Sequence, residues 1–323
     1  MFSQMVMQLV RSSRRLSMRR GKVRKIISAV LFTIALGFPL FAQIDLSGSW
    51  SARNSSDALS NQPGPEPTPV DFLGLPLNEY GRAGALIHSP SQLSMPDRIC
   101  AFYAPTYMMI GPFGLRIWNE TEPRNGGTVA WVIGGWEDMA PIKIWMDGRP
   151  HPSKKAPHEM AGFTTGVWEG DVLKAYTTHM RAGIIRRNGA PGSDETTMTT
   201  RFFRHGDLLT VTARIEDPIY LTDPYYLTRT FELTVAPPNR TVGQPCVQGD
   251  EGVKEGEVPH FFPGQNPFMD EMTKLYNIPV EAALGGAETM YPEYRKIIMD
   301  KYVIPEKCPR ACGGPGRFPR RLF

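Results

Sequence analysis

The stretch from Thr197 to Ile215, TMTTRFFRHGDLLTVTARI, shows most clearly how this chain folds. Two β-rich runs flank RHGD, where Gly206 can adopt the positive φ that a tight hairpin turn needs. In the first of these runs, both faces mix polar and apolar side chains. This pattern favours a sheet with a polar interior over a dry sandwich.

Similar runs recur at intervals of about ten residues, which is typical of an antiparallel sandwich or barrel. A second hairpin turn is expected at EGD, where Gly170 has the same conformational freedom as Gly206. We therefore predict a mainly β domain over residues 44–236. The other runs are LRIWNE, GTVAWVIGG, IKIWMDG, TGVWEGD, VLKAYTTHM and YLTRTFELTV.

The segment IDLSGSW, residues 44–50, contains a Gly-x-Trp group at the start of the first expected strand. This group resembles the opening of lipocalin-type barrels, in which the Trp plugs the closed end. The resemblance implies a lipocalin-like (calycin-type) barrel. The alternative is a short edge strand in which Trp50 is simply buried.

Outside the strands, NEYGRAGALI begins with Asn78 as a helix cap. Residues 237–323 are expected to form an extended, partly helical tail that wraps the barrel. Its two helical patches, Met269–Tyr276 and Pro292–Tyr302, are too short to build a core alone.

The formal charge of +4 overstates how basic the folded part is. Eight Lys and Arg residues and no acids lie in the first 25 residues, so the remainder carries about −4 (28 bases against 32 acids). A nucleic-acid partner is therefore not expected, since a basic face should persist in the folded domain.

The basic run precedes IISAVLFTIALGFPLFAQ, an apolar segment with a small-residue exit at Ala42. We interpret residues 1–43 as a secretory signal peptide, with Met1 or Met18 as the start. Gly37 and Pro39 interrupt the apolar run, which is also short for a membrane anchor. The expected product is exported to the periplasm or outside the cell, with no transmembrane anchor after cleavage.

In an exported chain, the four cysteines favour disulfides. Cys308 and Cys312 are close enough to pair, which would leave Cys100 and Cys246 as the second pair. Three connectivities are possible from the sequence, and a metal site at CPRAC is the weaker alternative.

The densest group of chemically capable residues is DGRPHP at 147–152 followed by APHEM at 156–160. His151 is the candidate general acid or base, Asp147 or Glu159 its orienting carboxylate, and Arg149 or Arg187 the group that steadies developing negative charge. A purely structural alternative pairs Asp147 with Arg149 to hold the turn. The spacing fits no sharp zinc signature, and we expect no metal.

Polar and aromatic residues of the later loops are candidates for substrate binding at the mouth of the barrel. The mouth is expected to be lined by the Asp147–His158 and Arg186–Asp194 loops. Asn188-Gly189 is also a strong turn signal in its own right. The candidate binding residues are His158, Trp168, Asp171, Arg187, Arg201 and Tyr220.

The series WMDGRPHP, GxWEGD, RRNGxPxSD and DPxYLTxP, after the DLSGxW opening, resembles a family of uncharacterised secreted bacterial proteins. The resemblance covers roughly residues 44–233 and implies export, but it implies no particular reaction. The family's usual Gly-His-Ser segment is replaced here by Gly162-Phe163-Thr164, so no role for that His transfers. His151 and Asp171 stand at matching positions.

The sequence favours an exported barrel that binds a small apolar or amphipathic molecule. An acid/base isomerase, lyase or hydrolase is the alternative, and a structural protein of the cell envelope is the second. There is no GxSxG, HExxH or phosphate-binding glycine loop, and no cofactor is expected. The oligomeric state and the ligand stay open.

Overall fold

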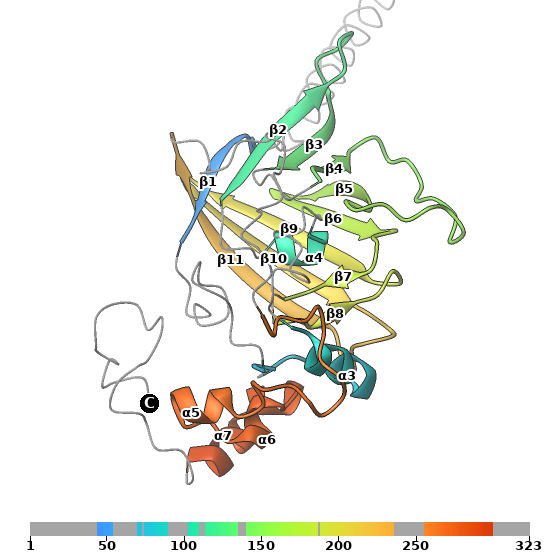
Figure 1. The fold of residues 1–323 in the computed structure, drawn as a ribbon. Helices are drawn as coiled ribbons and strands as arrows, with labels where there is room; N and C mark the ends of the chain where they lie inside the picture. The colour runs from blue at the N-terminus through green and yellow to red at the C-terminus, as the bar shows by residue number, and fades with distance from the viewer. Residues whose placement is uncertain are drawn as a thin grey trace, which may run out of the picture. The chain divides into compact units, whose positions relative to one another are not determined.

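A computed structural model describes residues 44–53, 70–72, 74–89, 103–109, 114–134, 140–186, 188–235 and 255–299. Nine strands form a closed barrel in the order β1-β11-β10-β9-β6-β5-β4-β3-β2 (Figure 1). The predicted barrel is thus confirmed. The barrel strands are β1 (Gly48–Ala52), β2 (Leu115–Thr121), β3 (Thr128–Gly134), β4 (Ile142–Trp145), β5 (Phe163–Glu169), β6 (Val172–Thr178), β9 (Thr197–His205), β10 (Leu208–Glu216) and β11 (Tyr225–Thr234).

Both predicted hairpins are present. The β5–β6 turn contains Gly170 at φ +66°, and the β9–β10 turn contains Gly206 at φ +59°. We call the end of the barrel that carries these turns the hairpin end, and the opposite end the helix end. All pairs of neighbouring barrel strands are antiparallel except β4 with β5, which are parallel.

Trp50 lies at the hairpin end and is fully buried. Its indole Nε1 donates to the carbonyl of Leu46 at 3.0 Å, and the Arg204 guanidinium lies over its ring at 5.2 Å. β1 pairs with both β11 and β2, so it closes the barrel instead of forming an edge. The edge-strand alternative is therefore wrong, whereas the role of Trp50 as a plug stays a prediction.

The helix end is covered by short elements that connect the strands. α3 (Glu79–Ile87) begins as predicted, because the Asn78 side chain accepts from the backbone N–H of Gly81. α4 (Pro105–Met108) belongs to a segment whose Tyr103 and Tyr107 are buried in the main core. A small hairpin of β7 (Gly183–Ile184) and β8 (Pro191–Gly192) follows β6.

The described part of the tail holds α5 (Glu271–Tyr276), α6 (Val280–Ala283), the 3-10 helix η1 (Ala287–Met290) and α7 (Pro292–Met299). Figure 1 shows these helices near α3, away from the β2–β3 hairpin. Backbone hydrogen bonds join the tail to the segment that contains α3. The N–H of Phe72 donates to the carbonyl of Ala283 at 2.8 Å, and the N–H of Phe261 donates to the carbonyl of Ile87 at 2.7 Å. Two of these helices match the predicted patches, whereas α6 and η1 were not predicted.

None of the helices among the described residues is long and apolar enough to cross a membrane. The predicted signal peptide and all four cysteines lie outside the described residues. Export and disulfide pairing therefore stay predictions.

Candidate functional site

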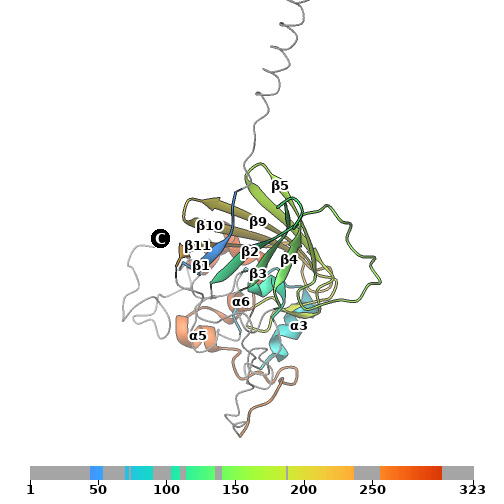
Figure 2. The same ribbon diagram turned by 90° about the horizontal axis from the view of Figure 1, so that it is seen from above.

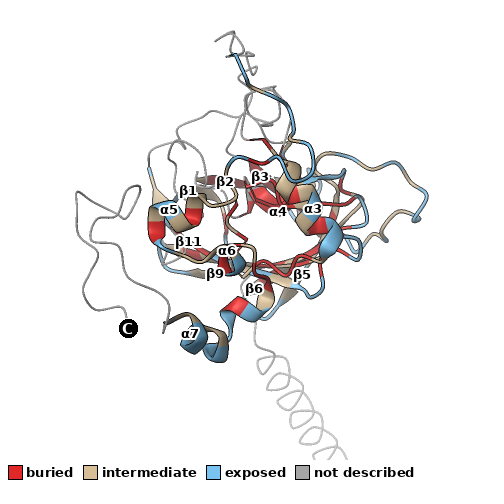
Figure 3. Ribbon diagram, turned by 60° about the horizontal axis from the view of Figure 1, so that its bottom comes forward, coloured by how far each residue is buried: buried red, intermediate tan, exposed pale blue. Residues whose placement is uncertain are grey.

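The inner wall of the barrel is set by the alternation of side chains along each strand. In β10, every second residue from Leu209 to Ile215 is buried, and the residues between them are only partly buried. Figure 3 shows buried segments, coloured red, around the ring of strands. Because neighbouring residues point to opposite faces, the buried set lines the interior. Most of this lining is apolar and belongs to one continuous core.

One row of this wall is built mainly of small side chains. Hydrogen-bonded neighbours continue the row from β5 to β11. At its β5 end, the space beside Gly166 is already filled by Ile144 and Met146. The row consists of Gly166, Ala175, Thr200, Ala213 and Leu227.

Polar atoms also lie on the inner wall. Nε1 of Trp131, Nε1 of Trp168 and Oγ1 of Thr200 are buried, and within the described part of the chain they have no hydrogen-bond partner. By contrast, Thr164 and Thr177 bond each other through their hydroxyls at 2.8 Å. Arg229, only 4% exposed, also has an inward position on β11.

The connection from β4 to β5, residues 146–162, runs outside the ring of strands (Figure 2). It has to return along the barrel, because β4 and β5 are parallel and a parallel pair needs a crossover. This crossover contains four of the residues predicted to be catalytic, namely Asp147, Arg149, His151 and Glu159. Two of them, Arg149 and His151, contact outward-facing side chains of the strands.

His151 is half-buried against the outer wall. Its Nε2 bonds Thr165 Oγ1 at 2.8 Å, and its Nδ1 bonds Thr178 Oγ1 at 2.7 Å. The ring also packs edge to face with the Phe163 ring and at a tilt against the Tyr176 ring, with centroids 5.1 and 5.2 Å away. Burial, and secondarily the charge of His179, lowers the His151 pKa below its usual value of 6.5.

His179 extends this contact into a chain whose proton positions can be deduced for neutral rings. Its Nε2 must donate to the Ser153 carbonyl, 2.9 Å away, because a carbonyl only accepts. Its Nδ1 then accepts from the Thr178 hydroxyl at 2.7 Å, so Thr178 in turn accepts from His151 Nδ1. His151 Nε2 is left to accept from the Thr165 hydroxyl.

This chain fastens the crossover to β5 and β6. It also explains the left-handed backbone of His179, with φ +57°, a conformation that costs a non-glycine residue roughly 1–2 kcal/mol. Sequence reasoning missed His179, since a lone His at a strand end has no distinguishing pattern.

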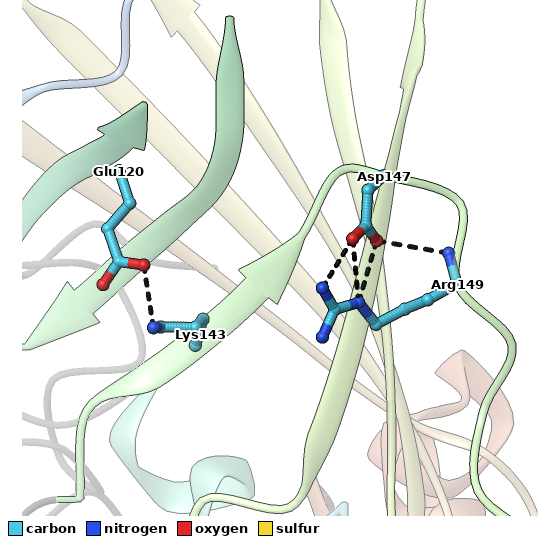
Figure 4. Close-up of polar contacts among 4 residues, drawn as sticks. All are labelled: Glu120, Lys143, Asp147 and Arg149. Carbon is cyan, nitrogen blue, oxygen red and sulfur yellow. Dashed lines mark hydrogen bonds and ion pairs between the residues drawn. The ribbon is translucent and has the colours of Figure 1, made fainter. Parts of the chain in front are cut away.

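Asp147, the first candidate to orient His151, bonds Arg149 instead (Figure 4). The shortest contact, from Arg149 Nη2 to Asp147 Oδ2, is 2.5 Å. The hydrogen bond from Arg149 is the main cause that lowers the Asp147 pKa to about 2. The Arg149 guanidinium also lies 3.5 Å above the Trp145 ring. This arrangement matches the structural alternative, a paired turn.

The second candidate carboxylate, Glu159, is exposed. Its backbone bridges to the strand end after β6, accepting from Arg181 and donating to His179. The His158 ring packs against the His179 ring with centroids 5.2 Å apart, and its Nδ1 donates to the Met180 carbonyl at 3.0 Å. His151 contacts threonine hydroxyls and aromatic rings, and its catalytic role stays a prediction.

The predicted binding residues are spread over the molecule. Trp168 points inward near the hairpin end, whereas Asp171 is exposed in the β5–β6 turn. Arg201 lies on the outer wall, 4.0 Å from Glu169. Tyr220 lies at the helix end, and Arg187 is outside the described residues. The structure thus does not bring the described members of this group together.

The Arg186–Asp194 loop, the second predicted lining of the mouth, is locked at the helix end. Gly189 has φ +87° and packs against His88, which confirms the Asn188-Gly189 turn. The Asn188 amide donates to the Asp71 carbonyl at 2.6 Å.

Asp217 fixes the other side of this loop. It is 4% exposed, and its two carboxylate oxygens accept five hydrogen bonds. This hydrogen-bonded node, centred on Asp217, fixes the end of the loop to the connection between β10 and β11. The donors are Ser193 N, Ser193 Oγ, Thr196 Oγ1, Ile219 N and Tyr220 N.

In the part of the chain that the structure describes, no three His, Cys, Asp or Glu side chains gather as a metal site would require. The arrangement as a whole defines a closed, largely antiparallel β-barrel, whose inner wall carries polar atoms that no described residue satisfies. Searches with family models, curated proteins and solved structures give no match to this chain.

Proposed function

We propose that the protein binds a small amphipathic molecule inside its barrel. The observation that carries the proposal is the set of buried polar atoms of Trp131, Trp168 and Thr200 that have no hydrogen-bond partner among the described residues. Leaving such a group unsatisfied costs about 1–3 kcal/mol, and native proteins pair nearly all of theirs. Three on one inner wall favour a bound molecule that supplies the missing partners.

The rest of the inner wall suits the apolar part of such a molecule. Leu173, Phe202 and Val211 form an apolar row beside the row of small side chains. Ala175 and Ala213 contribute short side chains to that row, on β6 and β10. Ligand sites are typically apolar with a few placed polar groups, as here.

The acid/base alternative is less well supported by the geometry. His151 lies on the outer wall, and both of its ring nitrogens bond threonine hydroxyls. Catalysis there would require this chain of bonds to open before a substrate could reach the ring.

Binding can be tested by titrating the protein with N-phenyl-1-naphthylamine, an apolar dye whose emission rises in apolar surroundings. Native mass spectrometry of protein from its own export compartment would show any molecule that co-purifies. We expect saturable binding of one dye per chain.

Ala213→Leu should fill the interior and weaken dye binding at least tenfold. Thr212→Leu, on the outer face of the same strand, is the matched control and should bind like the wild type. If Ala213→Leu does not fold, Ala175→Val offers a smaller change in the same row. No saturable binding by folded wild-type protein, or equal weakening by Thr212→Leu, would overturn the proposal.

A further inference from the structure

The unpartnered atoms on the inner wall share a chemical property. An indole N–H can only donate a hydrogen bond, so Trp131 and Trp168 both need an acceptor. The Thr200 hydroxyl can donate or accept. Two of the three atoms therefore require a hydrogen-bond acceptor from any ligand that contacts them.

Other polar groups of the wall do not reverse this bias. The hydroxyls of Thr164 and Thr177 satisfy each other. Arg229, whose guanidinium also only donates, is joined to Trp168 by one hydrogen-bonded row through β6, β9 and β10. By their alternation, the inward positions of β5, β6, β9, β10 and β11 hold no aspartate or glutamate among the described residues.

The spacing of two of these donors sets a scale. Trp168 on β5 and Thr200 on β9 are separated by β6 and by one inward-facing step along the strands. Strands lie about 4.8 Å apart and two residues span about 6.8 Å, so their Cα atoms are about 12 Å apart. One compact polar group with an apolar body suits this distance better than a wholly polar molecule.

We infer that the barrel selects a ligand whose polar group is an sp² oxygen acceptor, a carbonyl or a carboxylate, attached to an apolar body. This inference rests on the proposed function. A ligand with an ammonium group in that place would bring donors to face donors. It would also add a positive charge to an interior that already contains Arg229.

The test uses matched twelve-carbon ligands, namely dodecanoate, 2-dodecanone, dodecan-1-ol and dodecylammonium, each displacing N-phenyl-1-naphthylamine. We expect dodecanoate or 2-dodecanone to displace the dye at least tenfold more tightly than dodecylammonium. Comparing 2-dodecanone with dodecanoate distinguishes a neutral carbonyl acceptor from a charged carboxylate acceptor. Tighter binding of dodecanoate would assign a role to the charge of Arg229.

Variants then assign the effect to particular atoms. Thr200→Val keeps the shape of the side chain and Trp168→Phe keeps an aromatic ring, and each removes a hydrogen-bonding group. Each should weaken binding of the preferred ligand about fivefold, the size of one ordinary hydrogen bond. Dye binding should change little. Trp145→Phe, on the outer wall, is the matched control and should leave every affinity unchanged.

The outcomes separate the two proposals. Saturable dye binding with equal or tighter displacement by dodecylammonium overturns the acceptor inference and leaves ligand binding standing. Failure of folded wild-type protein to bind the dye removes both. If either variant fails to fold, Trp131→Phe supplies the same comparison at another donor.

Discussion

Replacing Asp217 by Asn should destabilise the barrel strongly, although only one atom of the side chain changes chemically. The buried carboxylate accepts two donors on Oδ2 and three on Oδ1. An asparagine amide has one oxygen, so it can accept either from the two donors now on Oδ2 or from the three donors now on Oδ1. In either orientation its NH₂ faces at least one backbone N–H, from Ser193 on one side or from Ile219 and Tyr220 on the other.

The magnitude follows from these bonds. A buried donor left without an acceptor costs about 1–3 kcal/mol, and the remaining bonds lose the strength that a charged acceptor gives them. We expect Asp217→Asn to lower the free energy of unfolding by about 3 kcal/mol. Asp217→Ala strands all five donors and should approach the total stability of an ordinary domain, about 5–15 kcal/mol.

The assay is urea unfolding followed by tryptophan fluorescence at neutral pH. For an m-value of about 2 kcal/mol/M, a loss of 3 kcal/mol moves the midpoint down by about 1.5 M. Asp223→Asn is the matched control, since Asp223 is exposed in the same connection and accepts from the Thr222 hydroxyl. Equal midpoints for Asp217→Asn and Asp223→Asn would refute the role given to this node.

Three further predictions concern charged groups elsewhere. Burial lowers the His88 pKa from 6.5 to about 4, so as pH falls through this window the unfolded chain takes up a proton that the folded chain does not. Stability should therefore drop by up to about 3 kcal/mol on acidification to pH 4, and an equal drop in His88→Gln would contradict this. His179→Asn, which tolerates the left-handed backbone, should raise the His151 pKa while leaving it below 6.5, because burial is the larger cause of its depression; NMR titration of the ring protons measures this, and an unchanged pKa would exclude the coupling. Arg204→Ala should cost about 1–2 kcal/mol in urea unfolding by uncovering Trp50, whereas a loss below 0.5 kcal/mol would mean that the contact contributes little.

The strands and turns could be predicted from the sequence because their signals are local. Gly170 and Gly206 permit positive φ at the two hairpins, and Asn78 is a standard cap. The strand periodicity needs only a few neighbouring residues to be seen. By contrast, the two extra helices of the tail are a single turn each and give no periodic signal.

The candidate site was less predictable, because its geometry depends on pairing between distant residues. The sequence placed His151 near acids only because they are neighbours in the chain, whereas its bonds go to Thr165 and Thr178. Nothing local shows that residues 146–162 form a crossover outside a parallel strand pair. Thr200 likewise looks like any threonine of a β-strand until its neighbours on both sides are known.

The sequence by itself determined a mainly β chain with its turns, one helix cap and a mixed polar and apolar face around Thr197–Ile215. Only the tertiary structure decided which face of that stretch points into the barrel and which residues meet there. The physical reason is range: turn and strand preferences come from a residue and its immediate neighbours, whereas the inner wall is assembled from strands far apart in sequence. For this reason, Thr200 in the Thr197–Ile215 stretch is the better residue to test for ligand binding than the crossover that contains His151.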